Sequence, residues 1–427
     1  MARSKTSDPM DAETQALLNE LTQRAVKSTR SSRAGKVTYI IGNNGTGKSR
    51  VLRQLADRLN SLRPARNVAC IANSIHDRFN FNDYGRVRYL GARNVGNAVF
   101  LSTIGRQVSR LILRAMLIDR RLYRDLCDAV SMNLEFRLSK DVEAEVRKIL
   151  EVPPERARGP RHKSRVYYEL GAAQPLSILR RVASRQGQFG LLTSVQIRML
   201  LQYLELGIDI QIHVRLADGS TLDFGELSTG EQNRMLTFAK VLSAMEDGTV
   251  FLIDEPEVSL HLHWQMRFHQ TLMDLLAGLD RFHVVVATHA PVLISEAAKS
   301  DPENDQNSVV ILRHVVDDDE SQAEVPPGAG KVAWKSHNFT EIASHDQLVL
   351  QYFQSAPYRT REISVEIADT VLSVAEGTRT RATAEDLLKW MKGIEGVSSD
   401  TKEQINKAIS LVQQDWTHML NSESSAA

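Results

Sequence analysis

The sequence predicts an α/β protein built around a mainly parallel sheet. The first indication is a set of continuous apolar runs, at Val37–Ile41, Thr249–Ile253 and His283–Ala287, which are typical of strands buried on both faces. The second is that polar residues of kinds that bind ligands follow each run. Loops at the carboxyl ends of parallel strands line the ligand crevice of such sheets, so the sequence places its chemistry at that edge.

A glycine-rich loop follows the first run and precedes a helical pattern from Arg50 to Leu59. This order of strand, loop and helix is that of a P-loop, which binds nucleotide phosphates through its backbone N–H groups. Lys48 would reach the β- and γ-phosphates and Ser49 would ligate Mg²⁺. A chance glycine-rich turn is the alternative, which the placement between strand and helix disfavours. The predicted phosphate-binding residues are Gly42, Asn43, Asn44, Gly45, Thr46, Gly47, Lys48 and Ser49.

Two adjacent acids, Asp254 and Glu255, follow the second run. Carboxylates at the end of a buried strand are costly unless they bind a cation or transfer a proton. Beside a P-loop, Asp254 is predicted to hold Mg²⁺, and Glu255 to orient and deprotonate the attacking water. The alternative, acids that favour a helix N-terminus, requires neither the pair nor the apolar strand. His289, after the third run, is predicted to sense the γ-phosphate, with a structural histidine as the alternative.

A third motif, Ser228-Thr229-Gly230-Glu231, begins another helical pattern. Ser228 and Glu231 have the spacing of a capping box, and that box alone would account for them. A serine-capped helix start in which Gly230 allows close backbone approach is also an anion site. From the residues themselves, both interpretations stay open.

Length and composition set broad limits on the protein. The 427 residues allow two or three domains, and the net charge of +1 gives no overall attraction for nucleic acid. The two cysteines, Cys70 and Cys127, exclude a disulfide scaffold or a cysteine-rich metal site. We expect a cytoplasmic protein without membrane spans, because no apolar run approaches about 18 residues and no signal-peptide pattern begins the chain.

The pattern along the chain predicts four regions. They are an N-terminal helical extension (1–35), a discontinuous core with the nucleotide motifs (36–94 and 240–350), a helical insertion that carries the serine motif (95–239) and a helical C-terminal region (351–427).

The sequence predicts several individual elements within these regions. The helix at Asp11–Ser28 is expected to pack on the surface or on a partner. Residues 95–205 show helical patterns and no strong strand runs, with one amphipathic stretch at Ser102–Val130. Residues 208–224 alternate around a turn at Asp218-Gly219 and predict a hairpin. Between two strand runs, Asp77 lies in a loop expected to be solvated, with contact to nucleotide as the alternative.

Two basic features of the insertion leave their role open. Arg106, Arg110 and Arg114 form a stripe on a predicted helix, which is either a solvated face or a surface for nucleic-acid phosphates or an acidic partner. Residues 152–165 form the most basic short segment of the chain and are predicted to be an exposed loop.

Together the motifs resemble those of ABC-type ATPases, whose Walker A, signature, Walker B and switch-histidine motifs follow one another in this order. The resemblance implies an ABC ATPase head with the P-loop NTPase fold, which binds ATP and Mg²⁺ and hydrolyses ATP. It also implies a homodimer, or a higher oligomer, in which Ser228 and Gly230 of one subunit contact the γ-phosphate on Lys48 of the other. Glu231 belongs to the same signature and is counted among the nucleotide-binding residues. The four motifs are Gly42–Ser49, Leu227–Gln232, Phe251–Glu255 and Thr288-His289.

Sequence details favour the RecF/SMC/OLD-like branch, often labelled AAA_21, over transporter subunits. The acidic motif continues as Pro256-Glu257-x-x-Leu260-His261, and 180 positions separate Lys48 from Ser228, more than is usual in transporters. No long heptad region marks a coiled-coil SMC protein, and no acidic Toprim pattern marks an OLD nuclease. A Q-loop glutamine is not assigned.

With those branches set aside, the chain resembles the compact ATPase subunits of bacterial anti-phage systems of the Septu and PARIS type. That resemblance implies a partner effector, such as a nuclease, which the ATPase regulates. A RecF-like DNA-repair ATPase that binds DNA directly is the alternative, and a transporter's nucleotide-binding subunit is a weaker one. Salt-dependent DNA binding by the isolated chain would favour the repair function.

Overall fold

The computed structural model divides into two compact units, Met1–Phe339 and Thr340–Ala427. The residues that it describes are 12–31, 36–74, 76–80, 82–92, 101–138, 192–206, 210–216, 218–301, 306–314, 332–342, 360–393 and 399–413.

The first unit is built on a seven-stranded sheet of order β10-β9-β1-β8-β7-β2-β3. Every neighbouring pair is parallel except β10, which runs antiparallel to β9. The predicted α/β fold with a mainly parallel sheet is therefore confirmed. The strands are β1 (Val37–Gly42), β2 (Val68–Ala72), β3 (Val87–Leu90), β7 (Thr249–Asp254), β8 (Phe282–Thr288), β9 (Ser308–His314) and β10 (Val332–Asn338).

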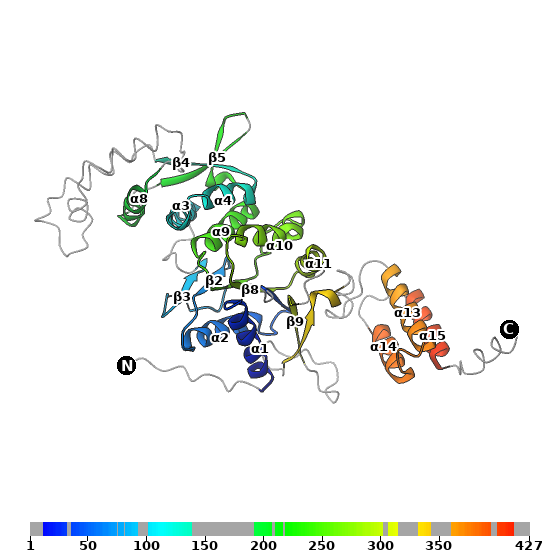
Figure 1. The fold of residues 1–427 in the computed structure, drawn as a ribbon. Coiled ribbons are helices and arrows are strands. Elements are labelled where there is room, and N and C mark those ends of the chain that lie inside the picture. Colours follow the sequence, from blue (N-terminus) through cyan, green and yellow to red (C-terminus); the bar gives the residue numbers. More distant parts are fainter. Residues whose placement is uncertain are drawn as a thin grey trace, which may run out of the picture. The chain divides into compact units, whose positions relative to one another are not determined.

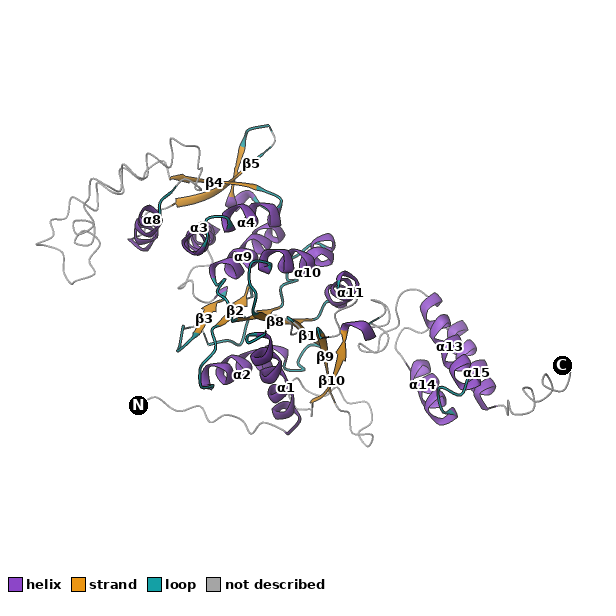
Figure 2. Cartoon of the chain, in the orientation of Figure 1, coloured by secondary structure: helices purple, strands orange, loops and turns teal. Residues whose placement is uncertain are grey.

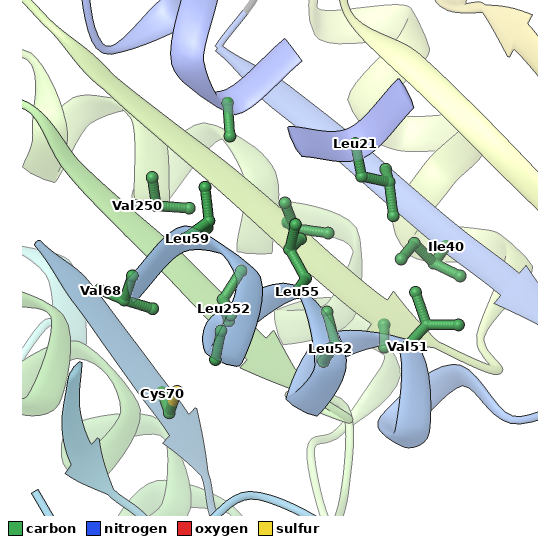
Figure 3. Close-up of a cluster of buried hydrophobic side chains, with 14 of the residues drawn as sticks. Leu21, Ile40, Val51, Leu52, Leu55, Leu59, Val68, Cys70, Val250 and Leu252 are labelled. Atoms are coloured by element: carbon green, nitrogen blue, oxygen red, sulfur yellow. The ribbon is translucent and has the colours of Figure 1, made fainter. Parts of the chain in front are cut away.

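Helices α1 (Ala12–Ser28) and α2 (Lys48–Ser61) cover one face of this sheet (Figure 1). Alternate strand residues point into the layer between them, as the two-residue period of a strand requires. Leu21 of α1, Leu55 of α2 and Val250 and Leu252 of β7 belong to one apolar cluster (Figure 3). The amphipathic N-terminal helix, expected on the surface or on a partner, is thus part of the core of its own chain.

Three further helices cover the opposite face (Figure 1): α9 (Thr229–Ser243), α10 (Leu262–Leu276) and α11 (Pro291–Ser300). Tyr39 of β1 points to this side, and its hydroxyl forms a 3.2 Å hydrogen bond with Nδ1 of His269 on α10. Phe238 and Phe268 stack between α9 and α10 with their ring centroids 6.0 Å apart. This face therefore connects the sheet to the helix that begins with the Ser228 motif.

A smaller lobe packs above α9 (Figure 2). It combines a three-stranded antiparallel sheet of order β4-β5-β6 with helices α3 and α4, α8 and a short 3-10 turn, η4. The hairpin predicted around Asp218-Gly219 is confirmed by the pairing of β5 and β6. Their bounds are α3 (Leu101–Ile118), α4 (Leu122–Val130), β4 (Asn133–Leu138), α8 (Ser194–Leu206), β5 (Ile210–Arg215), β6 (Thr221–Asp223) and η4 (Phe224–Glu226).

Two expectations for this lobe are corrected. Strand β4 lies inside the stretch expected to lack strands, where Leu134, Phe136 and Leu138 alternate with polar residues and pair with β5. The single helical stretch at Ser102–Val130 is two helices, because the chain turns at Asp119, whose side chain accepts from the backbone and guanidinium of Arg121.

The basic features differ in whether they can be placed. Arg106, Arg110 and Arg114 lie on α3, half-buried and engaged by other groups, so they do not form a freely solvated face. The basic segment 152–165 lies outside the described residues. Among the helices that the structure describes, none is long and apolar enough to cross a membrane.

The second unit is a three-helix arrangement of α13 (Thr360–Ala375), α14 (Arg381–Gly393) and α15 (Ser399–Gln413). Each helix contributes apolar residues to a common core, which includes Ile367, Leu388 and Ile405. The predicted helical character of the C-terminal region is confirmed for the residues of these three helices. A short 3-10 turn, η5 (Phe339–Glu341), spans the division between the units.

Truncation of Leu55 tests the packing of α2 on the sheet. Its side chain is fully buried (0% exposed) between α1 and the strands, so Leu55→Ala should lower the free energy of unfolding by about 2–5 kcal/mol. The matched control is Ile118→Ala at a side chain 51% exposed, expected to cost less than about 0.5–1 kcal/mol. Urea unfolding curves of both variants measure the difference, and equal losses would contradict the packing.

Candidate functional site

The P-loop follows β1 and leads directly into α2. Gly45 and Gly47 have φ angles of 85° and 89°, which glycine adopts without the steric penalty of a side chain. Lys48 begins α2, and its buried Nζ donates to the carbonyl oxygens of Gly42 at 2.8 Å and Asn43 at 3.3 Å. The loop thus holds its lysine folded back along its own backbone, as a phosphate cradle requires.

The predicted magnesium ligands lie within hydrogen-bond distance of each other. Ser49 Oγ donates to Asp254 Oδ1 at 3.1 Å, which joins the start of α2 to the end of β7. Burial raises the pKa of Asp254 to about 7, the charge of Glu255 adds to this, and the hydrogen bond from Ser49 opposes it. A hydroxyl beside a desolvated carboxylate offers the oxygen ligands that Mg²⁺ prefers, so these two residues fit the ion.

Charges around Lys48 act in both directions. Burial lowers the pKa of the Lys48 ammonium, while Glu255, Glu257 and Asp254 raise it. One cation therefore faces three carboxylates at this edge of the sheet. A second cation beside Asp254 would reduce that imbalance.

Glu255 and His289 are brought together because β7 and β8 are neighbouring parallel strands. His289 Nδ1 lies 3.6 Å from Glu255 Oε1, and both side chains are partly exposed. Glu255 has a positive φ of 47° and its N–H donates to the carbonyl of Ala287 at 2.8 Å. A non-glycine residue held in this conformation is strained, and the strain accompanies a carboxylate at the expected reaction centre.

Glu257 is a site residue to which sequence reasoning gave no role. Its side chain is buried, and its Oε1 accepts from Thr288 Oγ1 and from the N–H of His289, both at 2.7 Å. The signal was present in the Asp-Glu-Pro-Glu motif. The motif does not show which neighbour the second glutamate contacts.

The signature motif forms the predicted capping box. Ser228 N-caps α9, its Oγ accepts from the N–H of Glu231 at 3.3 Å, and the Glu231 carboxylate accepts from the Ser228 N–H at 2.9 Å. Among the described residues, no hydrogen bond or ion pair joins Ser228, Gly230 or Glu231 to the P-loop of the same chain. The structure therefore brings together the P-loop, Asp254, Glu255 and His289, and does not bring the signature to them.

Gly230 approaches the loop that follows Glu255. A Cβ atom at this position would lie 2.6 Å from the carbonyl oxygen of Ser259, closer than such atoms can pack. Asn233, one turn further along α9, donates to the carbonyl of Val258 at 3.4 Å. Ser259 itself has a positive φ of 63°. We call residues 255–260 the acidic-motif loop, since it begins with Glu255 and ends against the start of α9.

A buried polar network ties α9 to the end of β2. Lys240 is fully buried, and its Nζ donates to the carbonyl of Ala72 at 2.7 Å and to Asn73 Oδ1 at 2.8 Å. Burial lowers the pKa of Lys240 to about 7. Asp77 is buried too and accepts from Tyr89 at 2.7 Å, so the solvated loop expected for Asp77 is wrong. The network holds the signature helix firmly on the sheet.

Comparison with known proteins agrees with this geometry at the level of the domain. Residues 129–295, less than half of the chain, match the family model AAA_21, described as "AAA domain, putative AbiEii toxin, Type IV TA system". The match includes the signature, Asp254, Glu255 and His289, and it leaves out the P-loop. This part of the chain is therefore similar to domains of the AAA_21 family.

Two individual proteins are also similar. Protein ea59 of Escherichia phage lambda is 34% identical over 74 residues, which are 17% of this chain and only 14% of that protein. The Smc head domain of Pyrococcus furiosus, solved with an extended coiled coil and bound to the C-terminal domain of ScpA, aligns with 10% identity. That alignment covers 75% of this chain and 94% of the Smc chain with a TM-score of 0.30, too low for any conclusion about assembly.

The raised pKa of Asp254 predicts a pH dependence of stability. An unfolded aspartate titrates near pH 4 and the folded one near 7, so the folded chain keeps a proton that the unfolded chain releases in between. The free energy of unfolding should fall as the pH rises from about 4 to about 7, and level off above. Asp254→Asn should remove this loss and be more stable than the unmutated protein at pH 8, by roughly 1–4 kcal/mol.

Urea unfolding in EDTA at several pH values measures the effect. The control is Asp280→Asn, at an exposed carboxylate outside the site, which should leave the pH profile unchanged. Parallel profiles for Asp254→Asn and the unmutated protein would contradict the desolvation of Asp254.

The close approach of Gly230 to Ser259 gives a second prediction. Gly230→Ala should lower the free energy of unfolding by about 1–3 kcal/mol without any nucleotide, because the acidic-motif loop must move. Gly225→Ala is the matched control, since a Cβ there meets no atom within 4 Å. Thermal unfolding of both variants compares them, and equal melting temperatures would show that the contact does not form within one chain.

Proposed function

We propose that the protein is an ATP-hydrolysing switch whose two states depend on a second copy of the chain. The observation that carries the proposal is the convergence of Lys48, Ser49, Asp254, Glu255 and His289 on one edge of the sheet. Those side chains are the parts that phosphoryl transfer to water requires: a phosphate cradle, a metal site, a base and a group for the γ-phosphate.

Each residue has a defined task in this proposal. The P-loop N–H groups and Lys48 bind the β- and γ-phosphates, and Ser49 with Asp254 holds Mg²⁺, which would neutralise phosphate charge. Glu255 orients the attacking water and accepts its proton. His289 donates a hydrogen bond to the γ-phosphate and holds it in place.

The second copy is proposed because one chain does not complete the site. Ser228 is exposed and Gly230 and Glu231 are partly exposed at the start of α9, where the N-terminal N–H groups and helix dipole favour an anion. In a sandwich of two chains they would face the γ-phosphate on the partner's P-loop. The assembly would then form with ATP and open after hydrolysis.

The proposed role of the switch is to regulate an effector protein, such as a nuclease, in anti-phage defence. Its support is the resemblance of the motifs to those of anti-phage ATPase subunits, and the description of the matching family names a putative AbiEii toxin of a type IV TA system. Expression of the chain with the product of its neighbouring gene, followed by co-purification with and without ATP, tests it. If the two proteins form no complex either with or without ATP, this role is contradicted.

Replacement of Glu255 tests the hydrolytic function. Glu255→Gln keeps the size and hydrogen bonding of the side chain but removes the base, so ATP turnover should fall about 10²–10⁴-fold. ATP binding should persist, and the two-chain assembly should accumulate, because it no longer ends in hydrolysis. Turnover assays and light scattering with ATP measure both effects. Unchanged turnover would exclude Glu255 as the base.

Two control variants separate binding from assembly. Lys48→Ala should lose ATP binding, turnover and ATP-dependent assembly together. Ser228→Asp keeps a good N-cap but places a carboxylate against the partner's γ-phosphate. Mixed with Lys48→Ala it should raise turnover above the sum of the separate proteins, because one composite site is then intact. No rise, when subunit exchange is confirmed, would contradict the arrangement across two chains.

A further inference from the structure

A buried carboxylate lies behind the switch histidine. Glu257 has a side chain only 3% exposed, whereas the His289 side chain is 46% exposed, and Glu257 Oε1 lies 3.1 Å from His289 Nδ1. We propose that Glu257 is a positioning residue that fixes a proton on Nδ1 of His289 and so directs Nε2 toward the nucleotide phosphates. The proposal rests on the proposed function for the role of His289, but its main test does not.

The distance favours a proton on Nδ1. At 3.1 Å, Oε1 is close enough to accept a hydrogen bond from Nδ1, and Nδ1 can donate one only when it is protonated. The bond made by one ring nitrogen sets the state of the other. With Nδ1 committed to Glu257, Nε2 is left to meet substrate from the exposed side of the ring.

Distances decide between the two glutamates that flank His289. Glu255 Oε1 is 3.6 Å from Nδ1, beyond hydrogen-bond distance, while Glu257 Oε1 is 3.1 Å from it, within that distance. Glu257 also accepts from Thr288 Oγ1 and from the His289 N–H, so it is fixed relative to the ring's own backbone. Glu257 therefore orients the histidine and leaves the Glu255 carboxylate available for water.

The position of Glu257 also suits the donor role proposed for Nε2. A histidine that donates from Nε2 to a phosphate while Nδ1 donates to a carboxylate uses both of its ring nitrogens as donors. In the Ser-His-Asp catalytic triad, the acid behind the histidine likewise sets the orientation of the ring without itself exchanging protons.

A purely structural role is the competing explanation. By accepting from Thr288 and from the His289 N–H, Glu257 also holds the turn between β8 and α11. Thr288→Val is the matched control for that role: it removes one of these bonds and leaves the carboxylate and its contact with Nδ1. Glu257→Gln removes the charge but keeps an oxygen that can still accept from the turn.

Nitrogen-15 NMR of the full chain, with labelled histidines and no nucleotide, reads the proton position directly. The His289 signals are those missing from the spectrum of His289→Asn. We expect Nδ1 to carry a proton in the unmutated protein, and an unprotonated Nδ1 with the proton on Nε2 would overturn the proposal. This test needs neither ATPase activity nor a Glu257 variant that folds.

Variants then show whether Glu257 is the cause. The preference for a protonated Nδ1 should weaken in Glu257→Gln, whose neutral oxygen is a weaker acceptor than a carboxylate, and should be unchanged in Thr288→Val. A preference as strong in Glu257→Gln as in the unmutated protein would overturn the proposal, as would an equal weakening in both variants, because the turn alone would then explain it.

Turnover measurements extend the test to function. Glu257→Gln should lower kcat about 10–100-fold and change KM for ATP less than about 3-fold. Added to His289→Ala, it should lower kcat by less than about 3-fold more, since coupled residues are not additive. If the double variant instead lowers kcat by the product of the two separate effects, the proposal is overturned. If the unmutated protein hydrolyses no ATP, the proposed function fails, while the NMR result still decides the role of Glu257.

Discussion

The parallel pairing of β1, β8 and β7 is the constraint on which the site depends. Because these strands run in one direction and lie side by side, their carboxyl ends meet at one edge. β1 delivers the P-loop there, β7 delivers Asp254 and Glu255, and β8 delivers His289. The same constraint crowds carboxylates around Lys48 in a desolvated space, where their mutual repulsion is strong. Stability is thus given up at this edge for the ability to bind a cation.

Much of the site could be predicted from sequence because its motifs are local. The strand, glycine loop and helix at Gly42–Ser49 lie within a short span, and so does the capping box of Ser228 and Glu231. Their geometry is fixed by neighbours a few positions apart. The order of the strands was not readable, but the polar residues after each apolar run pointed to the edge where they meet.

The remaining site residues depend on contacts between distant segments, which no local pattern specifies. Glu257 contacts His289, 32 positions later, and Lys240 reaches Asn73 from α9. Gly230 matched a motif, yet its closest constraint is the Ser259 carbonyl of the same chain. An apolar stripe likewise showed that α1 buries one face, without showing that the face meets the sheet. Strand β4 is different, since its alternation was readable within a region that reads as helical overall.

The acidic-motif loop is anchored at both ends. Near its start, Glu257 binds the turn that carries His289, and near its end, Ser259 lies against Gly230 at the head of α9. Glu255 and Ser259 both have positive φ angles, which are strained for residues other than glycine. A displacement at one end of the loop is therefore expected to be passed to the other end. In the proposed assembly of two chains, a shift of His289 over one phosphate would move the signature that serves the opposite phosphate. The two proposed hydrolytic events would then be timed relative to each other rather than occur independently.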